Sequence, residues 1–389
     1  MKLWLFFAGL LGQAGALAEP VRVELTSQTA ASPRDAALPV RSVGRVAVEK
    51  NVSGASRYLH QWPGVYFDAR FRGDRVSLGF DDALNEYRLL IDDRAPVPLK
   101  PKGRAWYSIE GLGRGRHLVR LEKVTESVDY RGTFLGFFAA KGAADGKPAS
   151  PERQIEFIGD SSMTGYANRS TARQCTKDEV RDTTDTQQAF PALVAKAAGA
   201  DYQVNAISGR GLVRNYDNSL PGQALPDVYS RLFFDGSDRY DFRGWTPQIV
   251  VIKLDADFFG PLGPGEPWTS LDGLAAAYVE RFKGFIAQIS RRSPAATFLI
   301  WWPDPEAIPE PALAEMVRRG REEIAAGAAA AGVRRIGFLT PPGLTYELSA
   351  CDYHFSLSDH RAFASWLSAY LHGHPEYWEK PQRPPSTVP

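Results

Sequence analysis

Net charge is the first property that this 389-residue sequence lacks, because its 46 basic residues almost balance its 45 acidic ones. Nucleic acids and anionic membranes are bound through an excess of positive charge, so neither is expected as the main partner. Internal repeats and low-complexity tracts are also absent from the sequence. The composition, 44% hydrophobic and 23% charged, is typical of a folded protein and excludes a disordered or collagen-like chain.

The sequence also lacks an apolar run near the roughly 20 residues that a membrane-spanning helix requires. Its most apolar N-terminal stretch covers only 3–11, follows the single charge of Lys2, and is followed by an Ala-Leu-Ala site at 16–18. This pattern predicts a signal peptide over 1–18 and an exported protein, periplasmic or secreted. Without that segment the chain has 45 basic and 45 acidic residues and therefore no net charge. No membrane partner is expected after cleavage.

The remaining chain is predicted to form two domains, an all-β sandwich followed by an α/β domain. After a polar lead-in over 19–43, short strands broken by Gly, Asp and Pro run through 44–140, as is typical of a β-sandwich. Residues 141–151 are small, polar and rich in Pro and Gly, and indicate a linker. Residues 152–380 alternate apolar strands with amphipathic helices, and 381–389 form a tail. Such alternation predicts a parallel sheet covered by helices on both faces.

The expected elements follow from these patterns. Strands of the first domain are expected at 45–49, 65–71, 75–80, 87–91, 117–124 and 133–138. Strands of the second domain are expected at 155–158, 202–207, 249–254, 297–301 and 335–339, and helices at 187–198, 272–290, 311–331 and 358–371. The second domain is therefore predicted to contain a five-stranded parallel sheet.

A serine follows the first strand of this predicted sheet. Reactive groups of an open parallel sheet collect in the loops after the carboxyl ends of its strands. The first such loop contains Gly159-Asp160-Ser161, which places a hydroxyl at the mouth of the sheet and at the start of a helix. Ser161 is the candidate nucleophile, and a helix cap is its alternative role.

A nucleophilic serine requires a base, and the sequence offers only six histidines. Two lie in the sandwich region and two beyond the final helix, which leaves His354 and His360. Asp352 precedes His354 by two positions, close enough to orient its imidazole. His360 falls in the first turn of a predicted helix and is expected to pack against the scaffold. We therefore predict His354 as the general base and Asp352 as its orienting carboxylate.

Several motifs resemble those of the SGNH (GDSL) hydrolases: Gly-Asp-Ser after the first strand, Ser-Gly-Arg-Gly at 208–211, and Asp-x-His before the last helix. More narrowly, a β-sandwich followed by Gly-Asp-Ser-x-x-x-Gly-Tyr, the 208–216 motif and Cys-Asp-Tyr-His resembles carbohydrate esterase family 2. The resemblance extends from about 44 to 371. It implies a jelly-roll-like sandwich followed by an α/β/α hydrolase. It also implies a secreted bacterial enzyme that removes O-acetyl groups from plant polysaccharides.

The resemblance also implies roles for individual residues. Ser161 would be the nucleophile and His354 the base, with Asp352 or a backbone carbonyl holding the imidazole. The backbone N–H groups of Ser161 and Gly209 would form the oxyanion hole, together with a side-chain amide after the third strand. At that third position this chain has Asp257.

Asp257 is the clearest departure from the family pattern. An ionised carboxylate would repel the oxyanion that an amide stabilises, so Asp257 could contribute only if burial kept it protonated. Two alternatives remain open: Asp257 points away and pairs with an arginine such as Arg210 or Arg214, or the site has lost activity. Phe355 is a second departure, because it follows the candidate base where the family has proline.

Candidate substrate contacts are aromatic and planar polar residues in the loops, because such groups line sugar-binding clefts. Each has packing as its alternative role. The candidates are Tyr166, Arg214, Tyr216, Trp301 and Trp302.

The only two cysteines are Cys175 and Cys351. In an oxidising compartment an even pair of thiols most simply forms one disulfide, and two unrelated buried thiols are the alternative. The disulfide would join the segment that follows Ser161 to the loop that carries His354.

The leading hypothesis is an exported serine esterase that works as a monomer through an acyl-enzyme, without metal or organic cofactor. Its substrate would be an acetylated plant cell-wall carbohydrate of the acetylxylan or acetylmannan type. One alternative is a carbohydrate-binding protein whose turnover Asp257 has weakened. Another is a glycan O-acetyltransferase that uses the same residues.

Overall fold

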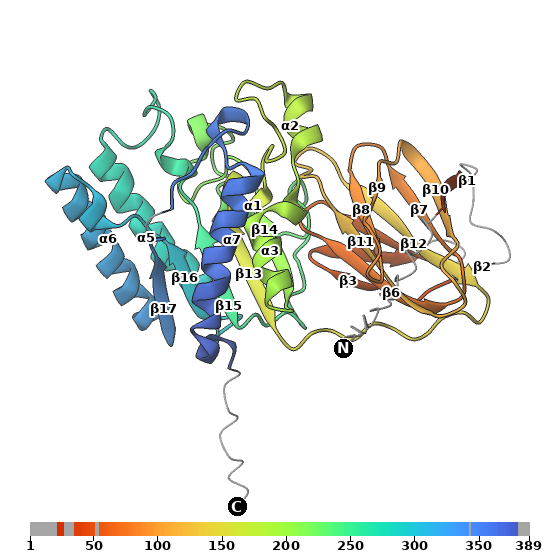
Figure 1. Cartoon of the computed structure of the whole chain (residues 1–389). Helices are drawn as coiled ribbons and strands as arrows, with labels where there is room; N and C mark the ends of the chain where they lie inside the picture. The colour runs from red at the N-terminus through yellow and green to blue at the C-terminus, as the bar shows by residue number, and fades with distance from the viewer. Residues whose placement is uncertain (1–21, 27–34, 51–53, 342–343, 380–389) are drawn as a thin grey trace, which may run out of the picture.

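The computed structural model describes residues 22–26, 35–50, 54–341 and 344–379. The expected signal peptide over 1–18 and the expected tail over 381–389 lie outside these ranges. Figure 1 shows a β-sandwich beside an α/β domain, as the sequence predicts. No helix in these ranges is long and apolar enough to cross a membrane.

The sandwich consists of two antiparallel sheets. One has the strand order β1-β10-β7-β12-β5-β4 with β2 beside β12, and the other has the order β3-β6-β11-β8-β9. The strands are β1 (Arg22–Thr26), β2 (Asp35–Ala37), β3 (Arg41–Val43), β4 (Val46–Lys50), β5 (Ser56–His60), β6 (Tyr66–Arg72), β7 (Val76–Asp82), β8 (Tyr87–Ile91), β9 (Val97–Leu99), β10 (Gly103–Glu110), β11 (Arg116–Lys123) and β12 (Gly132–Ala140). Their inward side chains alternate with outward ones, and the core between the sheets includes Phe67, Leu78, Phe80, Leu121 and Phe134.

The sandwich is larger than expected at both of its ends. The lead-in over 19–43 contains β1, β2 and β3, which pair with β10, β12 and β6. Part of the expected linker is bound to the sandwich, because the carbonyl of Ala143 accepts a hydrogen bond from the N–H of Arg72 in β6 at 2.8 Å. These strands are short and polar, so their pairing depends on neighbours that a local pattern does not reveal.

The second domain contains the predicted five-stranded parallel sheet, with the order β14-β13-β15-β16-β17. Its strands are β13 (Gln154–Gly159), β14 (Asp201–Ala206), β15 (Ile249–Lys253), β16 (Thr297–Trp301) and β17 (Arg335–Leu339). Its helices are α1 (Ser161–Thr164), α2 (Lys177–Thr183), α3 (Phe190–Ala197), α4 (Leu225–Val228), α5 (Leu271–Ser290), α6 (Pro311–Ala330) and α7 (Leu357–His372). Helices α3 and α7 cover one face of the sheet, and α5 and α6 cover the other (Figure 1).

Strand β14 is an edge strand, yet all six of its residues are buried. The sandwich covers it. The ring centres of Tyr66 and Tyr202 lie 5.1 Å apart, and Gly64 lies against Val204. A Cβ atom at Gly64 would come within 2.8 Å of a methyl group of Val204, and φ is +69° there, so this close approach requires glycine.

Buried arginines of the sandwich complete the domain interface. Arg41 pairs with Asp201 of β14 at 2.6 Å. Arg45 is fully buried; its Nε donates to Asn205 at 2.9 Å, and its guanidinium lies 4.1 Å from the Trp62 ring centre. Burial lowers the pKa of Arg45 to about 10. Such buried and paired polar groups hold the two domains in one arrangement.

Candidate active site

Ser161 is the first residue of α1, and one residue separates it from the end of β13. Asp160 caps this helix: its Oδ1 accepts the N–H and the hydroxyl of Ser162 at 3.1 and 2.9 Å. The capping role that was the alternative for Ser161 therefore belongs to its neighbour, and the Ser161 hydroxyl remains available for other partners.

The Ser161 hydroxyl faces the predicted base. Its Oγ lies 2.7 Å from Nε2 of His354, and Nδ1 of the same ring lies 2.9 Å from the backbone oxygen of Cys351. With its proton on Nδ1, the ring donates to that carbonyl and accepts from the serine. Burial lowers the pKa of His354, so the neutral imidazole that can act as a base is favoured.

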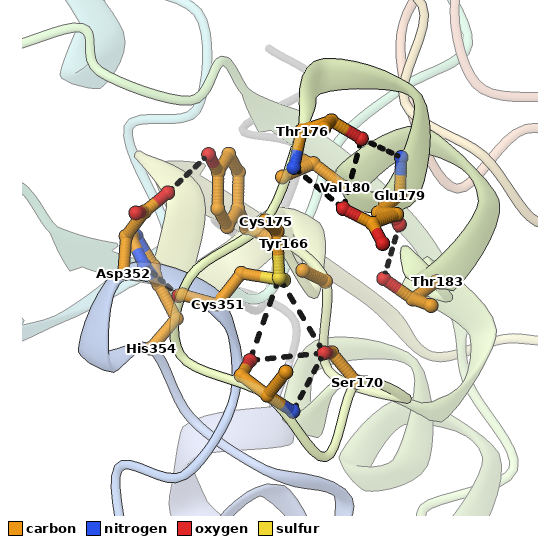
Figure 2. Close-up of a disulfide and its surroundings, with 12 residues drawn as sticks. Tyr166, Ser170, Cys175, Thr176, Glu179, Val180, Thr183, Cys351, Asp352 and His354 are labelled. Carbon is orange, nitrogen blue, oxygen red and sulfur yellow. Dashed lines mark hydrogen bonds between the residues drawn. A yellow bond between two sulfur atoms is a disulfide. The ribbon is translucent and has the colours of Figure 1, made fainter.

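Of the two supports for the imidazole that the sequence left open, the backbone carbonyl is the one that meets Nδ1, and the Asp352 side chain bonds to another residue. The Asp352 backbone is in the left-handed region, at φ +54°, and its exposed carboxylate accepts the hydroxyl of Tyr166 at 2.9 Å (Figure 2). The Tyr166 ring lies on the His354 ring, with centres 4.3 Å apart. The charge and the backbone of Asp352 still raise the pKa of His354, while the Cys351 carbonyl holds the imidazole directly.

The predicted disulfide joins Cys175 to Cys351, with a Cα–Cα distance of 5.7 Å (Figure 2). The disulfide links the segments 170–175 and 347–354, which together we call the strap. The strap also contains a backbone hydrogen bond from the N–H of Asp352 to the carbonyl of Arg173 at 2.8 Å. The Arg173 guanidinium lies 4.8 Å from the centre of the Tyr353 ring. The residue whose carbonyl holds His354 is therefore fixed covalently to the segment that follows the nucleophile.

Two backbone N–H groups are available beside the nucleophile. Within the described residues, neither the N–H of Ser161 nor that of Gly209 donates to a protein acceptor. Gly209 has φ +75°, which only glycine adopts without strain, and its carbonyl accepts the N–H of Tyr216 at 2.8 Å. Their role as oxyanion donors stays a prediction.

Asp257 is not a donor in this geometry, which corrects the expectation that it completes the oxyanion hole. Its side chain is fully buried, and its two oxygens accept the backbone N–H groups of Leu212, Val213 and Arg214 at 2.8 to 3.1 Å. Burial raises the pKa of Asp257, and these three N–H groups oppose the rise. The carboxylate therefore shapes the loop that follows Gly209 instead of facing the reacting carbonyl.

The chain matches known proteins over nearly its whole length. A family model described as carbohydrate esterase 2 N-terminal matches residues 42–148. A protein named acetylxylan esterase / glucomannan deacetylase from Cellvibrio japonicus is 36% identical over 355 residues, which is 91% of this chain and 96% of that relative. The chain belongs to carbohydrate esterase family 2.

Solved structures share the architecture of this family 2 esterase. One, of a carbohydrate esterase whose active site displays divergent catalytic and non-catalytic binding functions, has a TM-score of 0.80 and 34% identity, and the match covers 88% of this chain and 100% of that chain. Another, a family 2 enzyme of Corynascus thermopiles with a carbohydrate-binding domain, has a TM-score of 0.68 and 28% identity, with 86% and 98% covered.

Only some of the predicted substrate contacts are placed to meet a ligand of the esterase. Tyr216 is 55% exposed beside Gly209. Trp301 is partly buried against Phe363, with ring centres 4.5 Å apart. Trp302 is buried, and its Nε1 donates to the carbonyl of Val317 at 3.0 Å, so it belongs to the core.

Arg214 is also structural rather than exposed. Its Nε lies 2.6 Å from Oε1 of Glu266, and both side chains are almost completely buried. Sequence reasoning placed this arginine near Asp257, and the structure does bring them together through the Asp257 carbonyl at 3.2 Å. The ionic partner was missed because Glu266 lies in a loop without a recognisable pattern.

A buried lysine charge acts on the base. Lys253, at the end of β15, is buried and pairs with Asp255 at 2.8 Å, and the N–H of Asp255 donates to Asp160 at 3.1 Å. Burial works against the charge of Lys253, but Asp255 and Asp160 raise the pKa of Lys253. The Lys253 charge also disfavours protonation of His354.

Phe355 and His360 pack within the scaffold next to the loop of the base, with ring centres 5.6 Å apart. Phe355 occupies the position after the base, where its ring packs 4.9 Å from that of Tyr346. His360 is buried, and its Nδ1 accepts the N–H of Phe190 at 3.2 Å, as the expected scaffold role requires. Among the described residues, no group of three or more His, Cys, Asp or Glu side chains is arranged to hold a metal ion.

Proposed function

We propose that this family 2 esterase is exported and removes O-acetyl groups from plant cell-wall polysaccharide of the acetylxylan or acetylmannan type, through an acetyl-enzyme. The observation that carries the proposal is the 2.7 Å contact between Ser161 Oγ and His354 Nε2, with Nδ1 held by the Cys351 carbonyl. The substrate class follows the name of the Cellvibrio japonicus relative.

The reaction proceeds by two acyl transfers. His354 Nε2 takes the hydroxyl proton as Ser161 Oγ attacks the acetyl carbonyl, and the resulting oxyanion is bound by the N–H groups of Ser161 and Gly209. The tetrahedral intermediate collapses, the sugar oxygen leaves with the proton from His354, and the acetyl group stays on Ser161. Water, deprotonated by His354, then attacks the acetyl-serine, so that acetate leaves and the serine regains its proton.

The oxyanion hole is proposed to work with these two backbone donors. The segment 253–260 contains no side-chain amide. Of its two carboxylates, Asp255 pairs with Lys253 and Asp257 accepts backbone N–H groups. Loss of a single oxyanion donor costs roughly 10²–10³ in rate. The nearby Lys253 charge offsets part of this cost because it favours the build-up of negative charge at the site.

A polymer would lie over an exposed apolar surface beside Gly209. Tyr216, Leu220, Phe258 and Phe259 are 41–57% exposed, and the loops that carry them are joined by bonds from Arg214 to the carbonyls of Asp257 and Gly260. Exposed aromatic rings bind the apolar faces of sugars. This surface is proposed to hold the polysaccharide while one acetyl group enters the site.

Acetate release from acetylated glucuronoxylan and acetylated glucomannan tests the proposal. We expect the wild-type protein to release acetate, Ser161→Ala and His354→Ala to lose at least about 10³-fold of kcat/KM, and the exposed Ser365→Ala on α7 to match wild type. Binding of the polymers without any release of acetate would contradict the esterase. Faster transfer of acetyl to an added glycan than to water would instead indicate a transferase.

Export is tested on the mature chain. We expect protein recovered from the periplasm or medium of a bacterial host to begin at Glu19, because the predicted cleavage site ends at Ala18. Recovery of the full-length chain in the cytoplasm alone would contradict this part of the proposal.

A further inference from the structure

A carboxylate of the sandwich domain reaches the oxyanion loop of the hydrolase domain. Glu126 lies shortly after β11, and its Oε1 accepts the backbone N–H of Ser208 at 2.8 Å. Its Oε2 accepts the Ser208 hydroxyl at 2.5 Å, and that hydroxyl lies 3.0 Å from Oγ1 of Thr164 in α1. One side chain from the first domain thus binds two atoms of one residue in the second.

The residue that Glu126 holds directly precedes Gly209. The N–H of Gly209 belongs to the peptide plane that begins at the Ser208 Cα, so the position and rotation of Ser208 set the direction of that N–H. A carboxylate that accepts from both the backbone and the side chain of Ser208 fixes position and rotation together. Thr164 adds a third contact from the helix that carries Ser161.

The loop that carries Glu126 is itself anchored in both domains. The Val124 carbonyl accepts the N–H of Thr186 at 2.9 Å, and the Lys123 carbonyl accepts the Gln187 side chain at 3.0 Å. The Lys123 ammonium is fully buried and donates to the Gln61 carbonyl at 2.5 Å. Glu126 therefore extends from a fixed base.

Glu126 is partly enclosed in this arrangement. Burial raises the pKa of Glu126, and the hydrogen bonds from Ser208 and Thr164 and the charge of Lys123 oppose the rise. Each oxygen of the Glu126 carboxylate accepts a hydrogen bond from Ser208. Because hydrogen bonds to a charged acceptor are stronger than those to a neutral one, the carboxylate holds Ser208 more firmly than a neutral side chain would.

We propose that Glu126 is a positioning residue for ester hydrolysis: the sandwich domain fixes the Ser208-Gly209 peptide and thereby aims one of the two oxyanion donors. The inference rests on the proposed function of Ser161 and Gly209. It gives the first domain a part in the chemical step in addition to any part in binding.

Steady-state kinetics of four variants test this role. We expect Glu126→Ala to lower kcat at least about 10-fold with KM within about twofold of wild type, because the oxyanion develops only in the transition state. Glu126→Gln should restore kcat to within about threefold, since an amide can accept from the Ser208 N–H and donate to its hydroxyl.

Glu86→Ala is the matched control. Glu86 is another partly buried sandwich carboxylate that reaches the hydrolase domain, where it pairs with Arg169 at 3.1 Å, but it does not contact Ser208. We expect its kcat to equal that of wild type. A fall in kcat as large as that of Glu126→Ala would show a general effect of the interface and would overturn the inference.

Ser208→Ala extends the test to the other partner and covers the case in which Glu126→Ala does not fold. It keeps the N–H bond to Glu126 and loses only the hydroxyl bond, so we expect a kcat between those of wild type and Glu126→Ala. A folded Glu126→Ala that keeps wild-type kcat, or loses only in KM, would overturn the inference. If Glu126→Ala does not fold, wild-type kcat in Ser208→Ala would overturn it. An inactive wild-type protein would refute the proposed esterase itself.

Discussion

At the residue scale, the most informative contact is the one between His354 Nδ1 and a backbone carbonyl. An acceptor at this position fixes the tautomer and the direction of the ring, which catalysis requires. A carbonyl dipole stabilises the imidazolium less than a carboxylate would. The Tyr166 ring on the imidazole and the Asp352 carboxylate on the Tyr166 hydroxyl contribute the remaining support.

Asp352→Asn should therefore be mild. The asparagine oxygen can still accept the Tyr166 hydroxyl, and the Cys351 carbonyl still holds His354. We expect kcat/KM for acetyl-ester hydrolysis to fall less than about 10-fold, a barrier change below about 1.4 kcal/mol. A loss as large as that of His354→Ala would show instead that Asp352 orients the base during the reaction.

The pH profile should reflect the environment of His354. The base acts when neutral, so activity falls as pH drops through its pKa, and burial together with the Lys253 charge lowers that pKa. We expect the acid limb of kcat/KM to lie below the ordinary histidine value of about 6.5. An acid limb above that value would contradict the assigned environment. Lys253→Met, which removes the charge, should move the limb upward.

The catalytic pair could be predicted from sequence because each member lies in a short motif at the end of a sheet strand. Ser161 follows β13 closely, and His354 lies between the last strand and the last helix. The roles of Asp352 and Asp257 could not be predicted in this way. Which donor reaches a carboxylate depends on backbone direction. Asp352 lies on a left-handed backbone, and its carboxylate accepts the Tyr166 hydroxyl.

At the element scale, the loop after β14 is shaped by a carboxylate from the loop after β15. Asp257→Asn should weaken this loop, because an amide nitrogen would face N–H donors of the 212–214 backbone. We expect the free energy of unfolding to fall by about 1–3 kcal/mol, with lower activity and an unchanged alkaline limb. Denaturant unfolding and a pH–rate profile would show this. If Asp257→Asn instead raised the rate at neutral pH and moved the alkaline limb to higher pH, this would show that residue 257 belongs to the oxyanion hole.

The strap between 170–175 and 347–354 is the second element with a testable role. Loss of the disulfide should loosen the Cys351 carbonyl that holds His354, so we expect Cys175→Ser to lower kcat several-fold. The bond spans a sequence separation of 176 residues, and removal of a native disulfide typically costs about 2–5 kcal/mol of stability.

Cys351→Ser is the matched variant, since it removes the same bond from the other side. Both single variants and the double variant should unfold at the same temperature. A Cys175→Ser protein with wild-type kcat and wild-type thermal stability would show that hydrogen bonds alone hold the strap.

Most elements of the second domain could be predicted from sequence, and fewer of the first. Strands β16 and β17 were predicted with their observed bounds. Four of the five residues of β16 are buried, and strands buried on both faces are mostly apolar. In the sandwich, β8 was predicted with its observed bounds, but β10, eight residues long, was missed. Its polar outer face and central Trp-Tyr pair do not alternate clearly, so its place is set by pairing with β1 and β7.

At the scale of the whole molecule, buried arginines join the two domains. Arg45→Met would leave Asn205 and the carbonyls of Tyr229 and Arg231 without their donor. We expect a loss of at least about 2 kcal/mol in the free energy of unfolding, because buried acceptors without partners are costly. The exposed Arg70→Met on β6 should change it by less than about 0.5 kcal/mol.

The same interface should make unfolding cooperative. We expect calorimetry of the wild-type protein to show one transition, with fluorescence and far-UV circular dichroism changing together. Two separated transitions in the wild-type protein would show that the domains are energetically independent. An Arg45→Met protein as stable as wild type would show that the arginine adds nothing to the interface.

The cover that the sandwich places on β14 has a consequence for solubility. An edge strand with unpaired backbone groups is a template on which another chain can add a strand, and proteins protect such edges by charge, shortness or cover. Here Tyr66, Gly64 and Arg41 provide the cover. A shortened chain that kept only the hydrolase domain would bare a six-residue edge and its apolar flank. The truncated protein should tend to form β-rich aggregates. By covering β14, the sandwich therefore also protects the hydrolase domain against aggregation.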